Sequence, residues 1–252
     1  MRLKMSKNNK FYLNNPEEPS VHSLRDKLHK ALAKEEFIVE IPITEDEIIE
    51  ITESSNGAKL KKVSIEKLNY SDDKSKVDRI WKINLEKEIE KEIFGISAKN
   101  KTPECAILVL QKYEIENKIS YKLNILLIEL KSSISNQDLR PIGEKFQCAM
   151  SRIYMLLVLN NHLNLTKGYS KEEIHIDFKG ILFYQNFSDK SKFTEKNNEK
   201  LYSQMYDILR TPGKSHLLTC RTILRDQDKI NIKCFCQQDE EIRISLESLL
   251  SK

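Results

Sequence analysis

One apolar run carries an acid and a base, two residues apart, near its end: Ile125-Leu126-Leu127-Ile128-Glu129-Leu130-Lys131-Ser132-Ser133. An apolar run this short, bounded by polar segments, is typical of a buried β-strand. Successive side chains on a strand point to opposite faces, so Glu129 and Lys131 share one face and Leu130 lies on the other. A buried charge is costly unless it is paired or bound to a metal. This strand therefore needs an explanation that an ordinary core strand does not need.

The segments on either side of this run complete the predicted core. Residues 103–110 are typical of an earlier strand introduced by a proline, and this strand can pair with the Glu129 strand as an antiparallel hairpin. The polar segment 113–121 would connect the two strands. A helix is expected to open at Arg140-Pro141-Ile142, with the proline in its first turn, and to continue to about Leu159. Its apolar stripe consists of Phe146, Ala149, Met150, Ile153 and Leu157.

Shorter patterns predict the remaining elements and the domain organisation. Strands are expected at 37–41, 48–51, 78–84, 174–184, 216–224 and 230–235, and helices at 21–35, 85–94 and 198–209. The order strand, strand, long helix, strand predicts an α/β or α+β fold, with a mixed sheet flanked by helices. We divide the chain into residues 1–84, a substrate-binding, regulatory or dimerisation region, and residues 85–252, the core with its C-terminal strands.

Length, charge and hydropathy exclude several classes of protein. A chain of 252 residues can bury a sizeable core, and its net charge of +4 is modest, so a basic surface requires local clustering. It has no apolar run of about 18 residues, and residues 1–10 lack the apolar segment of a secretory signal. Five cysteines, an odd number, favour reduced thiols. These features predict a cytoplasmic protein with no membrane partner.

The order of charged residues along the predicted hairpin supplies a functional hypothesis. Glu104 follows Pro103 at the start of the first strand, and the triplet Glu129-Leu130-Lys131 lies in the second. This order resembles the PD-(D/E)XK nuclease superfamily, whose core is a mixed sheet flanked by helices, with an acid opening one strand and a (D/E)-x-K triplet in the next. The resemblance covers roughly residues 85–185. It implies a restriction-endonuclease-like core with N- and C-terminal additions.

The resemblance also implies roles for the matched residues. Glu104 and Glu129 would bind Mg²⁺ or Mn²⁺, and the Leu130 carbonyl would supply a further ligand. Lys131 would orient or deprotonate the attacking water, or stabilise the developing charge. The family usually has Asp after the proline, so Glu104 is a departure that shifts the geometry of the site.

Further residues are expected around this centre. Some branches of the family carry a Gln or Glu on the following helix, where Gln147 or Glu144 could match, and we assign Gln147 to the catalytic site. Lysines and arginines that contact phosphates give affinity for nucleic acid without sequence choice. The residues expected to bind substrate in this way are Lys145, Arg152, Lys190 and Lys192.

These features predict a metal-dependent endonuclease, with DNA as the expected substrate rather than RNA and with restriction, defence or repair as the setting that the family implies. A homodimer would suit double-strand cleavage, because one site handles one strand. The alternative is a non-catalytic nucleic-acid-binding or assembly protein on an α/β scaffold. Glu-x-Lys triplets arise easily when 32% of residues are charged, and most are exposed ion pairs. The cysteines lack C-x-x-C spacing, so we expect buried thiols instead of a zinc site.

Overall fold

The computed structural model describes residues 38–53, 55, 57–85, 102–115, 118–159, 174–187, 215–221 and 229–251. Seven strands of these segments form a large sheet in the order β1-β4-β5-β6-β7-β9-β8. They are β1 (Ile38–Ile41), β4 (Ser75–Asn84), β5 (Cys105–Ile115), β6 (Lys118–Ile134), β7 (Ile174–Phe187), β9 (Lys229–Cys236) and β8 (Ser215–Arg221). A small sheet has the order β10-β3-β2, from β10 (Glu241–Ser245), β3 (Lys62–Glu66) and β2 (Ile49–Thr52).

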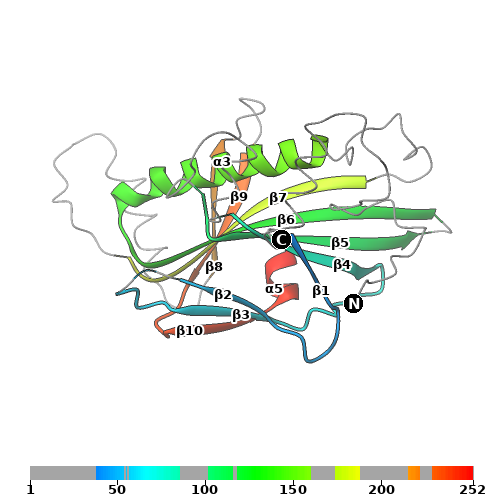
Figure 1. The fold of residues 1–252 in the computed structure, drawn as a ribbon, viewed down its shortest axis with the longest axis horizontal. Coiled ribbons are helices and arrows are strands. Elements are labelled where there is room, and N and C mark those ends of the chain that lie inside the picture. The colour runs from blue at the N-terminus through cyan, green and yellow to red at the C-terminus, as the bar shows by residue number, and fades with distance from the viewer. Residues whose placement is uncertain are drawn as a thin grey trace.

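Two helices complete the described elements, α3 (Asn136–Leu159) and α5 (Leu246–Leu250). The helix α3 covers one face of the large sheet, and the small sheet and α5 cover the other (Figure 1). The large sheet is mixed, because β1, β4, β5 and β6 pair antiparallel whereas β6, β7 and β9 pair parallel. The prediction of a mixed α/β fold is therefore confirmed, with a second sheet, unforeseen from the sequence, on the face opposite α3.

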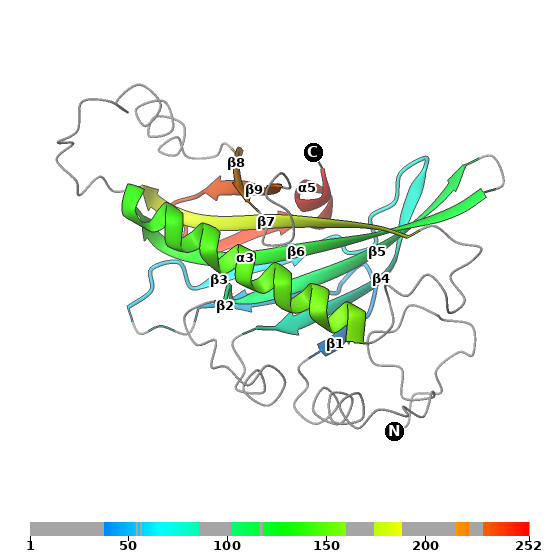
Figure 2. The same cartoon turned by 90° about the horizontal axis from the view of Figure 1, so that it is seen from above.

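Side-chain alternation along β6 divides the core into two apolar layers. Ile125 and Leu127 pack with the apolar stripe of α3, whereas Leu126, Ile128 and Leu130 pack toward the small sheet and α5. Since residues two apart on a strand share a face, Glu129 lies on the α3 side. Seen from above, α3 lies across the central strands (Figure 2). The helix is therefore placed to bring polar side chains to the end of β6.

A glycine in β7 lies where Ile232 of β9 and Phe146 of α3 come together. A Cβ atom on Gly180 would lie 2.9 Å from Ile232 Cγ1 and 3.4 Å from Phe146 Cδ2. The first distance is shorter than ordinary carbon contacts, so a larger residue here would force the neighbouring side chains apart. The absence of a side chain at Gly180 thus leaves room for Ile232 of β9, and Phe146 of α3 would lie at an ordinary contact distance.

The helix α3 begins one turn earlier than predicted. The Asp138 carboxylate accepts hydrogen bonds from Ser135 N (2.7 Å) and Ser135 Oγ (2.6 Å), an arrangement like the capping box of helix N-termini. These contacts start the helix at Asn136, so Pro141 lies inside it. The expectation that Pro141 stands in the first turn was wrong, because the Ser135–Asp138 cap precedes the proline.

The hairpin of β5 and β6 is confirmed as antiparallel, and it is longer than predicted. Pairing continues through Lys112 with Tyr121 and Tyr113 with Ser120 as far as Ile115 with Lys118. The segment 113–121, expected as a connection, thus lies mostly in the two strands. Polar residues can extend a strand when the ladder of backbone hydrogen bonds is satisfied by its neighbour.

The other predicted elements have mixed outcomes. The strands expected at 37–41, 48–51, 78–84, 174–184, 216–224 and 230–235 are found as β1, β2, β4, β7, β8 and β9, apart from ends that lie outside the described residues. The helices expected at 21–35, 85–94 and 198–209 also lie outside them, except for Leu85. Both sheets take strands from both sides of the division predicted after Asn84, and the roles assigned to the two regions remain predictions.

Among the described helices, none has the length and apolar character needed to cross a membrane.

Candidate active site

The hairpin places the acid of β5 against the charged triplet of β6. Cys105 pairs with Ile128, so Glu104, one residue before Cys105, lies beside the segment that follows Ile128. The Leu130 N–H donates a hydrogen bond to Glu104 Oε2 at 2.9 Å. The structure therefore joins Glu104 to the Glu129-Leu130-Lys131 segment through a direct contact, although the two acids are far apart in the sequence.

Glu129 lies at the centre of the site, with a fully buried side chain. Its Oε1 atom accepts hydrogen bonds from Lys131 Nζ at 2.7 Å and from Lys145 Nζ at 2.6 Å. Its Oε2 atom is buried and has no hydrogen-bond partner among the described residues. A buried carboxylate oxygen without a partner is costly, and such an atom in a native structure calls for a functional or structural explanation.

The charges of the site influence one another strongly. Burial raises the pKa of Glu104 well above its ordinary value, the negative charge of Glu129 raises it further, and Lys131 opposes the change. Burial by itself would lower the pKa of Lys131, but the Glu129 carboxylate outweighs this effect and the pKa is raised overall. An added cation would stabilise the charged form of Glu104, whose ionisation is opposed by burial and by the neighbouring Glu129.

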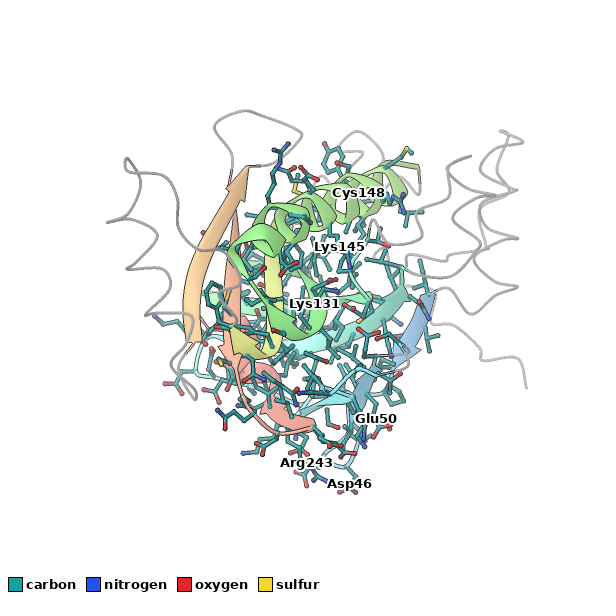
Figure 3. All side chains as sticks on the ribbon, turned by 90° about the vertical axis from the view of Figure 1, so that its left-hand side faces the viewer. Asp46, Glu50, Lys131, Lys145, Cys148 and Arg243 are labelled. Atoms are coloured by element: carbon teal, nitrogen blue, oxygen red, sulfur yellow. The ribbon has the colours of Figure 1, made fainter. Side chains whose placement is uncertain are left out.

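The helix α3 contributes Lys145 to the site. Successive residues of a helix are about 100° apart around its axis, so Lys145 and Gln147 flank the buried Phe146 on opposite sides. Lys145, whose side chain is 17% exposed, is the one that contacts Glu129. Figure 3 shows Lys145 pointing from α3 toward Lys131 at the end of the strand. Gln147 is half-buried on α3, and its catalytic role remains a prediction.

The remaining predicted residues have varied positions. Arg152 is buried on α3, so it is not part of an open basic surface, and its contact with substrate remains a prediction. Glu144, the alternative to Gln147, is exposed and pairs with Arg140 at 2.9 Å. Lys190 and Lys192 lie outside the described residues.

Two loops are anchored beside the triplet by residues that the sequence patterns did not single out. Ser132 Oγ accepts hydrogen bonds from Lys59 N at 2.7 Å and Leu60 N at 3.2 Å. On β7, the buried Gln185 donates to the Asp239 carbonyl at 2.8 Å. Both contacts join residues far apart in the chain, so only the fold reveals them. They fix the loops that surround the carboxyl ends of β6 and β7.

The donor set suits a hard divalent cation. Carboxylate and carbonyl oxygens are the ligands that Mg²⁺ and Mn²⁺ prefer. Glu104, Glu129 and the Leu130 carbonyl are the candidates, and the partnerless Glu129 Oε2 is an acceptor available for such an ion. No cluster of three or more His, Cys, Asp or Glu that could hold a metal occurs in the part of the chain that the structure describes. A metal here would therefore depend on two carboxylates together with backbone or solvent oxygens.

Three cysteines, Cys105, Cys234 and Cys236, are buried and form no disulfide, in agreement with the buried thiols expected from the sequence. Burial raises the pKa of Cys234 to about 12 and also raises the pKa of Cys236. These thiols are therefore protonated at neutral pH and unsuited to nucleophilic chemistry.

Neither a family model, a curated protein nor a solved structure matches this chain.

Proposed function

We propose that this protein is a metal-dependent nuclease with a PD-(D/E)XK-like core. The hydrogen bond from Leu130 N to Glu104 Oε2 is the main support, because it joins the acid that opens β5 to the triplet on β6. The antiparallel β5–β6 pair, the α3 helix over it and the parallel β7 agree with the mixed sheet that the resemblance implies. The small sheet and α5 on the second face are a departure from a sheet flanked by helices.

In this proposal each group of the site has a distinct task. Glu104 and Glu129 would hold Mg²⁺ or Mn²⁺, which when bound neutralises phosphate charge and lowers the pKa of a coordinated water. Lys131, with 32% of its side chain exposed, extends from the buried Glu129 toward solvent. Its ammonium group can therefore donate a hydrogen bond to a phosphate oxygen or to the attacking water. Lys145 of α3 contacts the buried Glu129 carboxylate from the helix side.

The substrate and the assembly follow from the family resemblance. We propose DNA over RNA, and a homodimer for double-strand cleavage, since one site of this kind handles one strand. The reduced thiols Cys105, Cys234 and Cys236 support a cytoplasmic setting as part of the same proposal.

A second candidate function is supported by the same ion pairs. Lys131 and Lys145 already neutralise Glu129, and the contact with Lys145 connects the sheet to α3. The cluster could thus be a structural link in a non-catalytic nucleic-acid-binding or assembly protein. Such a link requires no metal, so Mn²⁺ should leave its melting temperature unchanged, whereas a carboxylate metal site should be stabilised by Mn²⁺.

A substrate panel tests the proposed function. Purified protein is incubated with single-stranded DNA, double-stranded DNA and RNA in Mg²⁺, Mn²⁺ or EDTA, beside a Glu129→Gln variant. We expect cleavage that requires the metal and is lost in the variant. Equal cleavage by the variant would show that a different site, or a contaminant, is responsible.

A further inference from the structure

Glu129 Oε1 is already contacted by two positive charges before any metal ion binds. Lys131 Nζ and Lys145 Nζ both contact this single oxygen, at 2.7 Å and 2.6 Å. A divalent ion that enters the site adds two positive charges next to these ammonium groups. Since like charges repel strongly where water is scarce, one of the ammonium groups has to withdraw when the ion binds.

The two lysines differ in how firmly they are held. Lys131 lies on the same strand as Glu129 and also experiences the charges of Glu104 and Glu53. Lys145 comes from a different element, and Glu129 is its only hydrogen-bond and ion-pair partner in the described part of the chain. Its four-carbon stem lets the ammonium group move without a shift of α3. Lys145 is therefore the lysine that leaves at the lower cost.

We propose that Lys145 is the resident counter-cation of the metal site: it neutralises Glu129 in the metal-free protein and is displaced when the metal binds. This inference rests on the proposed function and specifies how its site is regulated. Lys145 lowers the apparent metal affinity, and it keeps the buried carboxylate paired until an ion arrives. It is a positioning residue for Glu129, with a role distinct from the phosphate contact that its sequence position suggested.

Mn²⁺ titration tests this inference directly. Free Mn²⁺ is measured by electron paramagnetic resonance for wild type, Lys145→Met, Lys145→Arg and Glu129→Gln at neutral pH. Lys145→Met should bind Mn²⁺ about tenfold more tightly, because the ion no longer has to break the charge-assisted hydrogen bond between Lys145 and Glu129. The free energy of such a bond corresponds to roughly this factor in affinity. Lys145→Arg keeps the positive charge and should stay close to wild type. Lys145→Gln supplies a second neutral variant if Lys145→Met does not fold.

The outcomes separate this inference from the proposed function. If Lys145→Met and Lys145→Gln bind Mn²⁺ no more tightly than wild type while Glu129→Gln loses binding, the counter-cation role is wrong and the metal site stands. If no protein binds Mn²⁺, both proposals fail. A purely structural role for Lys145 predicts a lower melting temperature in the variants without any gain in metal affinity.

Discussion

Replacing Glu129 by glutamine tests whether the buried ion pairs connect the sheet to α3. The carboxylate is fully buried and accepts hydrogen bonds from Lys131 and Lys145, whose side chains are 32% and 17% exposed. Removing one partner from a fully buried ion pair costs about 3–5 kcal/mol. Both lysine side chains are partly exposed, so water can solvate them in part, and Glu104 loses an unfavourable neighbour. We therefore expect a smaller loss of about 2 kcal/mol. For a domain of this size, that loss lowers the melting temperature by roughly 4–8 °C.

Thermal and urea unfolding in EDTA measure this loss without a contribution from bound metal. Glu66→Gln is the matched control, because Glu66 pairs with Arg243 at 3.3 Å on the small sheet and the Arg243 side chain is 73% exposed. Figure 3 shows Arg243 far from Lys131 and Lys145. A surface pair of this kind is worth about 0–1 kcal/mol. If Glu129→Gln melts at the same temperature as wild type and Glu66→Gln, the ion pairs do not connect the helix to the sheet as described.

Two further substitutions test the site and the packing beneath it. Burial and Glu129 raise the pKa of Glu104, so the folded protein binds an extra proton and its stability falls as pH rises from the ordinary glutamate value of about 4.3 through the raised one. Glu104→Gln lacks this titrating group, so the melting temperature of the variant in EDTA should rise relative to that of wild type as pH increases across that window. A difference in melting temperature that does not change with pH would contradict the raised pKa of Glu104. Gly180→Val should cost about 1–3 kcal/mol in urea unfolding because its Cβ would collide with Ile232. A variant as stable as wild type would show that the Ile232 side chain can move aside without loss.

The β5–β6 hairpin and the meeting of its charged residues could be predicted from the sequence because local patterns determine them. The apolar alternation of β6 fixes which face carries Glu129 and Lys131, and a shift by one residue would turn both to the wrong side. An antiparallel partner that begins at Cys105 then necessarily brings Glu104 near the end of β6. These features depend on the period of a strand and on the pairing of two consecutive strands.

The small sheet could not be predicted in the same way. Its strands β3 and β10 pair in parallel, although Lys62–Glu66 and Glu241–Ser245 come from distant parts of the chain. Each segment has only two aliphatic residues among polar ones, which is a weak strand signal by itself. Their stability comes from packing on the lower face of the large sheet, and this contact is absent from any local pattern.

The role of Lys145 also required the structure. Its sequence position beside the triplet indicated a basic residue near a substrate, and only the phase of α3 shows that the side chain turns inward to Glu129. That phase depends on the Ser135–Asp138 cap and on the close packing of Phe146 over Gly180. A surface cation and a buried counter-ion cannot be distinguished until these contacts are known.

Nicking of supercoiled plasmid DNA is the most direct test of the nuclease function. Wild type, Lys131→Ala and Glu66→Gln are compared in Mn²⁺ and in EDTA, at equal concentrations of folded protein. We predict nicking by wild type and Glu66→Gln that stops in EDTA, with a rate at least about 10²-fold lower for Lys131→Ala, the typical loss when a group that stabilises transition-state charge is removed. Equal nicking by wild type and Lys131→Ala, or no metal-dependent nicking by either, would contradict a nuclease site at the β5–β6 junction.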